Sequence, residues 1–184
     1  NDDLAAQSIA SVQKAIVRLI ARGGGGLVAR GVIIDGKGTA LTDRAALDAS
    51  GATDFSAYLY SGELVPVSVR SAASTTAIAI LDIKVGTSTG FAPAAVADLS
   101  KMKLGSSVIR IGGVGADTVG EGVVATLPSK DSPNLIEASV QSATPGSVLI
   151  NLFGEIIGIS TGVSRFIGSD FYSAPINNAT TTPH

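Results

Sequence analysis

The feature of this sequence that most constrains its fold is a succession of short apolar runs separated by glycine-containing turns. Residues 27–34 and 39–42 form two such runs on either side of Asp35-Gly36-Lys37-Gly38. Asp-Gly between apolar runs is typical of a β-hairpin, because glycine accepts the positive φ that hairpin turns require. Runs of similar length recur at residues 15–21, 55–60, 64–70, 77–85, 107–111, 119–127, 135–140, 148–152, 155–161 and 171–174. About a dozen short strands at this spacing predict an all-β chain folded as an antiparallel barrel or sandwich.

Two further segments organise the chain around these strands. Leu4, Ile9 and Val12 follow a pair of aspartates at helical spacing, which predicts a short capped helix at the N-terminus. The glycine- and threonine-rich stretch 86–93 is the best candidate for a linker between two halves. We therefore expect one short helix followed by two β lobes.

Composition excludes several classes of function. Aromatic residues make up 4% of the chain and apolar residues 45%, so we expect a core of Val, Ile, Leu and Ala. The net charge is −2 and no basic run occurs, which argues against nucleic acid or an anionic membrane surface as a partner. Cysteine is absent, which excludes thiolate metal sites and disulfides, and no run of 18 apolar residues occurs. The acidic residues lie mostly at turn-like positions, so we expect neither a metal nor a cofactor.

Four segments, in order, resemble the HtrA-like (Deg-type) family of trypsin-fold serine proteases. They are G-V-I-I-D-G-K-G-T-A-L-T at 31–42, A-I-A-I-L-D-I at 77–83, A-D-L-S-K-M-K-L-G-S-S-V-I-R-I-G at 97–112 and N-L-F-G-E-I-I-G-I at 151–159. A-P-I-N at 174–177 is a weaker match to the end of the family's domain. The resemblance covers most of residues 14–178. It implies one domain over 1–184 with two six-stranded antiparallel β-barrels, at about 14–85 and about 96–178, joined by a linker at 86–95.

The resemblance also locates the positions at which the family carries its catalytic triad. The histidine position is Ala45, the aspartate position is Ala77, and the nucleophile position is Pro145 within A-T-P-G-S-V-L-I. All three are vacated, and the one histidine of the chain is His184, its last residue. The resemblance therefore implies a catalytically degenerate member, a pseudoprotease. Simultaneous Ala, Ala and Pro are more typical of natural decay than of an engineered knock-out.

Ser147 is the remaining hydroxyl near the vacated nucleophile position, and an active serine endopeptidase with an atypical site at Ser147 is the alternative. A serine hydroxyl needs a base to remove its proton. Pro145 lacks the backbone N–H that helps to stabilise the oxyanion in the family. Lys101 and Lys103 have no spacing that argues for burial, so a serine–lysine pair is not expected. We favour the interpretation of Ser147 as a turn serine before a strand.

A binding or structural module is therefore the function that we expect. The cleft between the two barrels of such a fold can accept an extended peptide by strand addition. The residues expected around this cleft are Ser142, Thr144, Gly146, Ser147, Ser160, Thr161 and Gly162. The expected partner is a protein or peptide, and the oligomeric state is left open. The resemblance and the start at Asn1 also suggest an extracytoplasmic protein, periplasmic or at the cell surface, with an anchor in a preceding segment.

Overall fold

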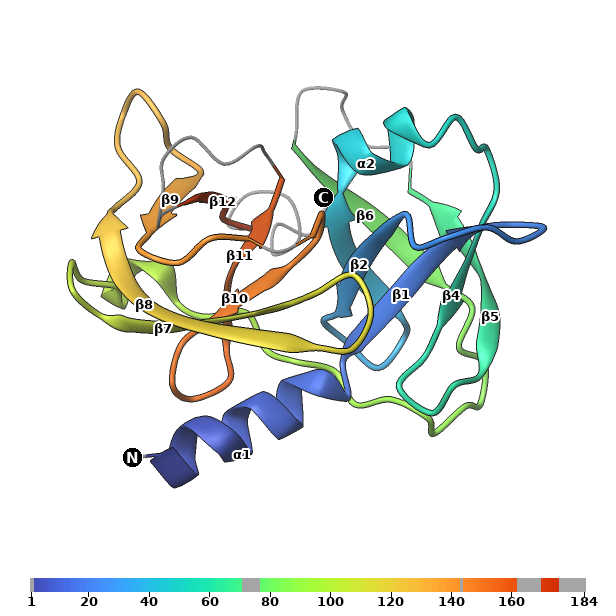
Figure 1. Ribbon diagram of the computed structural model, residues 1–184, viewed down its shortest axis with the longest axis horizontal. Coiled ribbons are helices and arrows are strands. Elements are labelled where there is room, and N and C mark those ends of the chain that lie inside the picture. The colour runs from blue at the N-terminus through green and yellow to red at the C-terminus, as the bar shows by residue number, and fades with distance from the viewer. Residues whose placement is uncertain (1, 71–76, 143, 162–169, 176–184) are drawn as a thin grey trace.

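The chain folds into two closed antiparallel β-barrels of six strands each, which lie side by side (Figure 1). This computed structural model describes residues 2–70, 77–142, 144–161 and 170–175. Both the predicted all-β class and the predicted pair of six-stranded barrels are confirmed. The predicted N-terminal helix is present as α1 (Asp2–Gln13).

In the N-terminal barrel the strands are hydrogen-bonded in the order β1-β2-β3-β6-β5-β4, and β1 pairs with β4 to close the ring. The Asp35–Gly38 turn joins β2 to β3, as the hairpin pattern predicted. All six strands precede the predicted linker. Their bounds are β1 (Ile16–Ala21), β2 (Ala29–Ile33), β3 (Thr39–Asp43), β4 (Phe55–Tyr58), β5 (Leu64–Val69) and β6 (Ile78–Ile83).

The C-terminal barrel has the strand order β10-β11-β12-β9-β8-β7 and closes where β10 pairs with β7. A 3₁₀ turn, η1 (Leu99–Lys101), leads into it. The strand bounds are β7 (Ser107–Gly112), β8 (Thr118–Thr126), β9 (Leu135–Ala138), β10 (Val148–Ile150), β11 (Ile156–Ser160) and β12 (Asp170–Ser173).

Three aliphatic clusters explain why some strands are apolar throughout and others alternate. One fills the N-terminal barrel, one fills the C-terminal barrel, and the third lies between the barrels. β2, β3 and β11 are buried at every position because one face points into a barrel while the other meets the neighbouring barrel. β5, with its outer face in solvent, alternates between buried and exposed residues over most of its length.

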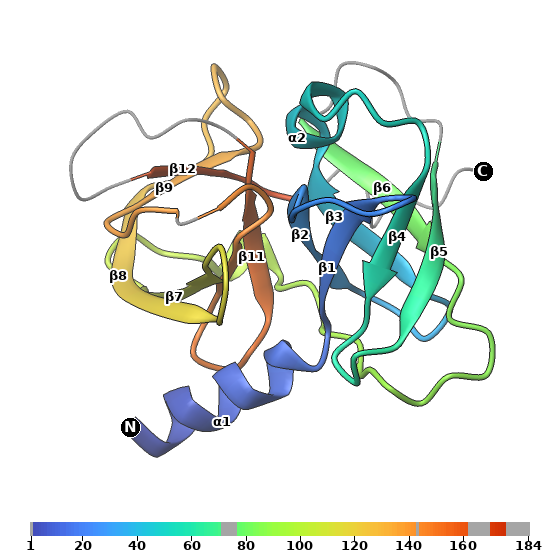
Figure 2. The same cartoon turned by 45° about the vertical axis from the view of Figure 1, so that its right-hand side comes forward.

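A second helix, α2 (Arg44–Ala49), follows β3 directly and was not predicted from the sequence. Its six residues are too few to establish a helical period in the sequence. Asp43 starts the helix by accepting a hydrogen bond from the backbone N–H of Ala45 at 3.0 Å. Both views show α2 at the edge of the N-terminal barrel that faces the C-terminal barrel (Figure 2). None of the helices in the described residues is long and apolar enough to cross a membrane.

Candidate functional site

The structure brings the predicted histidine and aspartate positions together. Ala45 lies in the first turn of α2, and Ala77 lies immediately before β6. The N–H of Arg44 donates to the carbonyl oxygen of Ala77 at 3.0 Å, which fixes the start of α2 against the start of β6. Ala45 and Ala77 are both exposed. Neither methyl side chain can accept or donate a proton.

The predicted nucleophile position, Pro145, belongs to the C-terminal barrel and is hydrogen-bonded to the N-terminal barrel near this place. The carbonyl oxygen of Pro145 accepts a hydrogen bond from the N–H of Arg30 on β2 at 2.9 Å. The carbonyl oxygen of Arg30 in turn accepts from the hydroxyl of Thr42 on β3 at 2.6 Å, one residue before the cap of α2. A continuous chain of hydrogen bonds therefore runs from Pro145 towards Ala45. Pro145 is exposed.

Gly146 explains how closely the two barrels approach at this point. Its φ is +79°, and a Cβ added there would lie 1.9 Å from the carbonyl oxygen of Arg30. Its N–H donates to the carbonyl oxygen of Ser160 at 3.0 Å. Only glycine fits between β2 and β11 in this conformation. Its role at this position is therefore structural.

The hydroxyl of Ser147 is fully buried and engaged in its own turn. The Ser147 side chain has 0% exposure, and its Oγ donates to the carbonyl oxygen of Thr144 at 2.6 Å. The same oxygen accepts from the N–H of Thr144 at 3.1 Å. These contacts close a turn before β10, which is the role that the sequence analysis favoured for Ser147. Neither of these hydrogen bonds is to a side chain that could act as a base.

The residues expected around the cleft do come together, but most of them are buried. Thr144, Gly146, Ser147 and Ser160 are buried and bonded to one another or to neighbouring backbone. Ser142 and Thr161 are half-buried, which leaves them as the members of this set with access to a ligand. Gly162 lies outside the described residues, as does His184.

Two carboxylates near the barrel interface, Asp43 and Asp117, are engaged in structural contacts. Burial raises the pKa of Asp43, whose oxygen is occupied by the helix N–H of Ala45. Asp117, in the turn between β7 and β8, accepts from Gln13 at 2.7 Å and forms an ion pair with the fully buried Arg30. Burial opposes its ionisation, yet the hydrogen bonds from Gln13 and Arg30 hold the pKa of Asp117 below its ordinary value. Arg30 lies in an otherwise apolar run, and this position was not singled out in the sequence.

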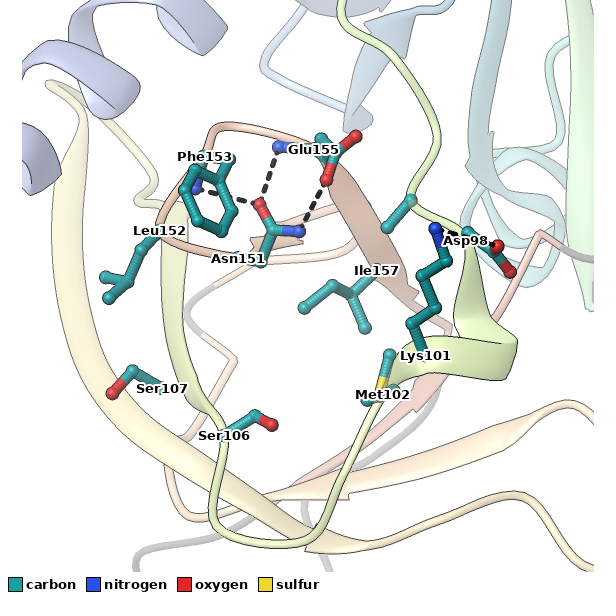
Figure 3. A pocket seen from close by; sticks show the side chains of 11 residues that line it. Asp98, Lys101, Met102, Ser106, Ser107, Asn151, Leu152, Phe153, Glu155 and Ile157 are labelled. Carbon is teal, nitrogen blue, oxygen red and sulfur yellow. Dashed lines mark hydrogen bonds and ion pairs between the residues drawn. The ribbon is translucent and has the colours of Figure 1, made fainter.

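A cavity of about 450 Å³ lies on the C-terminal barrel between η1 and the β10–β11 hairpin (Figure 3). Its lining includes Ile157, Met102 and the exposed Phe153. Asn151 organises the hairpin, because its Oδ1 accepts from the N–H groups of Phe153 and Glu155, both at 3.0 Å. Neither the predicted triad positions nor the expected cleft residues line this cavity. The sequence indicated the turn but not the cavity.

Asp170, the first residue of β12, is bonded to the expected cleft residue Ser142 and was not predicted from the sequence. Only 2% of it is exposed, and its Oδ2 accepts from both the N–H and the hydroxyl of Ser142, each at 2.6 Å. Burial and the negative charge of Asp170 together raise the pKa of Tyr172. The available signal was a charged residue two positions before a tyrosine on a predicted strand, where side chains share one face.

The sequence matches no family model and no curated protein. The structure is similar to that of the HtrA-type protease AlgW with a decapeptide, at a TM-score of 0.75 and 15% identity. The match covers 92% of this chain and 63% of the AlgW chain, so this chain spans less than two thirds of that protein. Together with the two closed six-stranded barrels, this likeness shows that the chain has the trypsin-like fold that HtrA-type proteases share.

Proposed function

We propose that this chain is a catalytically inactive trypsin-fold domain that binds an extended segment of a protein partner between its barrels. The observation that carries the proposal is the convergence of Ala45, Ala77 and Pro145 on one region of an intact fold. The chemistry of this fold needs a nucleophile, a base that removes its proton and an acid that orients the base. None of the three side chains at these positions supplies any of these groups.

Ser147 does not restore the chemistry. Its hydroxyl proton is committed to the carbonyl oxygen of Thr144, and its side chain has 0% exposure. An attacking serine must instead direct its oxygen at a substrate carbonyl while a base accepts its proton. Pro145 also lacks an N–H, and loss of one oxyanion donor typically lowers the rate by about 10²–10³. An atypical serine endopeptidase therefore has no observation in its favour.

Peptide binding is supported by the fold and by the surface that remains at the cleft. AlgW was solved with a decapeptide, which supports the same ligand class for a chain of the same fold. An extended peptide gains affinity from main-chain hydrogen bonds and specificity from alternate side chains. In this chain Pro145 is exposed at this place, and Ser142 and Thr161 are half-buried.

A matched pair of proline substitutions tests this binding. Fluorescence anisotropy of a labelled decapeptide library should show saturable binding to the wild-type protein. Pro145→Trp places an indole at the vacated nucleophile position and should weaken binding at least about 10-fold, because it occupies the cleft. Pro66→Trp, at an exposed position of β5, is the control and should bind like the wild type. Absence of saturable binding, or equal binding by both variants, would contradict the proposal.

We also propose that the protein acts outside the cytoplasm, in the bacterial cell envelope. The support is the HtrA-like character of its sequence segments and fold. Fractionation of the cells that produce the protein should place it in the periplasmic or surface fraction. Recovery in the cytoplasmic fraction alone would contradict this location.

A further inference from the structure

A small hollow of about 120 Å³ lies where the N-terminal barrel meets the β7–β8 turn of the other barrel. Arg18 of β1 lines it, together with Tyr58 at the end of β4 and Tyr60 two residues further along the chain. Pockets for small molecules usually enclose about 300–1,000 Å³. This hollow therefore has room for one side chain of a partner rather than for a whole small molecule.

The strand register explains why these side chains are presented together. Ala57 and Leu59 are buried, whereas Tyr58 and Tyr60 are 39% and 58% exposed. Side chains two residues apart on an extended chain share a face, so both tyrosines face outward on the same side. Tyr58 is the register partner of Arg18 on the adjacent strand β1 (Figure 2). One guanidinium and two exposed aromatic rings therefore share one face of the barrel.

The guanidinium of Arg18 is held in place but forms no ion pair with any described residue. Its Nη2 donates to the carbonyl oxygens of Val114, at 3.1 Å, and Gly115. No hydrogen bond within the described part of the chain involves its Nε or Nη1. Because the five N–H donors of a guanidinium lie in one plane, the two bonds to the turn also orient the remaining donors.

The one carboxylate that lines the hollow, that of Asp117, is already engaged. Its Oδ1 accepts from Arg30 and its Oδ2 from Gln13. Burial opposes its ionisation, but these hydrogen bonds and the charges of Arg30 and Arg18 hold the pKa of Asp117 below its ordinary value. A single carboxylate therefore faces two guanidiniums, and Arg30 takes both of the closer contacts, the ion pair and the hydrogen bond.

The other polar groups beside the hollow leave this excess of positive charge in place. Glu63 belongs to the same turn as Tyr60, but its Oε1 accepts from the hydroxyl of Ser88 at 3.0 Å. The hydroxyls of Tyr58 and Tyr60 form no hydrogen bond with the described residues. The chemistry offered to a partner is thus one oriented cation between two aromatic rings with hydroxyl groups.

This combination of residue types favours an acidic side chain of a protein as the occupant. Tyrosine and arginine are enriched among the residues that dominate binding energy at protein interfaces, because a tyrosine ring offers a large contact area at low entropic cost. A carboxylate matches a guanidinium in both charge and geometry. The methylene groups of a glutamate can pack against the rings while its carboxylate reaches the guanidinium.

We infer that this hollow is a docking site for an acidic segment of a partner protein. One glutamate or aspartate side chain of the partner lies between Tyr58 and Tyr60, and its carboxylate binds Arg18. Neither Pro145 nor any of the expected cleft residues lines the hollow. The inference therefore adds a second interaction surface and does not require that the cleft binds a peptide.

A pair of peptides that differ only in charge tests this docking site. Binding of Ala-Ala-Glu-Ala-Ala and Ala-Ala-Gln-Ala-Ala, both with blocked ends, is measured by NMR titration. The glutamate peptide should bind at least about 10-fold more tightly and shift the amide signals of Tyr58 and Tyr60, because hydrogen bonds between charged groups are the stronger ones. Arg18→Gln should reduce the ratio to below about 2-fold. Arg22→Gln removes an equal charge from an exposed position just after β1 and should leave the ratio unchanged.

A second variant tests the contact with the aromatic rings. Tyr60→Ala should weaken the binding of both peptides at least about 5-fold and preserve their ratio, because the ring contacts methylene groups that glutamate and glutamine share. Phe153→Ala removes another exposed ring, 75% exposed on the β10–β11 hairpin, and should bind like the wild type. The chain has no tryptophan and Tyr172 is fully buried, so tyrosine fluorescence reports independently on Tyr58 and Tyr60.

Equal binding of the two peptides, or a preference for glutamate that persists in Arg18→Gln, would overturn the inference. Pro145→Trp separates this site from the proposed cleft. Unchanged binding of the glutamate peptide to that variant would support the hollow, even if the decapeptide library fails to bind and the proposed function is contradicted. Loss of binding in Pro145→Trp would assign the peptide to the cleft and overturn the inference.

The remaining outcome is that neither peptide binds, which would also overturn the inference. Sedimentation velocity of the wild type and Arg18→Gln would then show whether a second copy of the chain occupies the hollow. Self-association of the wild type that is lost in Arg18→Gln would assign the surface to that copy in place of an acidic partner.

Discussion

At the scale of single residues, Gly146 sets how closely the two barrels can meet. Its positive φ and the 1.9 Å approach of an added Cβ to the carbonyl oxygen of Arg30 mean that any side chain must displace backbone. Glycine at this position is therefore a requirement of the fold, independent of catalysis.

Gly146→Ala should consequently lower the free energy of unfolding by roughly 3–5 kcal/mol, the range of the most damaging core substitutions. The matched control is Gly51→Ala, where φ is +71° and no heavy atom lies within 4 Å of the added Cβ. In that variant only the positive φ is unfavourable, so its free energy of unfolding should fall by about 1 kcal/mol. Urea unfolding of both variants measures the difference. Equal losses would mean that the contact with Arg30 does not constrain the structure.

At the scale of elements, Arg30 ties β2 of one barrel to the β7–β8 turn of the other. Its guanidinium donates to the carbonyl oxygens of Gly113 at 2.9 Å and Gly115 at 3.2 Å, in addition to its ion pair with Asp117. Arg30 is fully buried and Asp117 is 24% exposed, so the pair is shielded from solvent on one side. Loss of one partner leaves the other charge buried and uncompensated.

Asp117→Asn should therefore destabilise the protein by roughly 2–4 kcal/mol at neutral pH. Because the pKa of Asp117 is lowered in the folded protein, its contribution is present above the unfolded-state pKa of about 4 and is lost as the pH falls through the lower folded-state pKa. The variant should thus lose less stability on acidification than the wild type.

The control is Asp82→Asn, which breaks the exposed ion pair with Arg70 and should lower the free energy of unfolding by less than about 1 kcal/mol. Thermal unfolding across pH 2–7 checks both, and identical acid profiles for Asp117→Asn and wild type would contradict the assignment.

Much of the fold could be predicted from the sequence, because strand length, turn glycines and apolar runs are local signals. The hairpin at Asp35–Gly38 is an example. The partners of Arg30 and Asp170 could not be predicted, since each contact joins segments far apart, 87 residues in the case of Arg30 and Asp117. The sequence shows that a charged residue lies in a strand, but it does not show which distant residue the charged side chain contacts. The assignment of Ala45, Ala77 and Pro145 to the triad positions came from the family resemblance rather than from any physical pattern.

At the scale of the whole molecule, the two barrels share an aliphatic interface that does not include Ala45, Ala77 or Pro145. The interface cluster includes Leu41 and Ile80 from the first barrel, and Val148 and Ile150 from the second. Burial of this apolar surface stabilises the barrel pair without any contribution from the triad positions. The stability of the fold therefore does not depend on catalytic side chains at these three positions, as the proposed inactive, peptide-binding role requires.

The most direct test of this account is covalent labelling of the folded protein by a fluorophosphonate, which modifies serines that a base activates. Intact-mass analysis after long incubation, with an active trypsin-fold protease as the positive control, should show an unmodified chain. Ser147→Ala should be indistinguishable from the wild type in the same assay. Stoichiometric labelling of the wild type that disappears in Ser147→Ala would contradict the account and establish an active serine at that position.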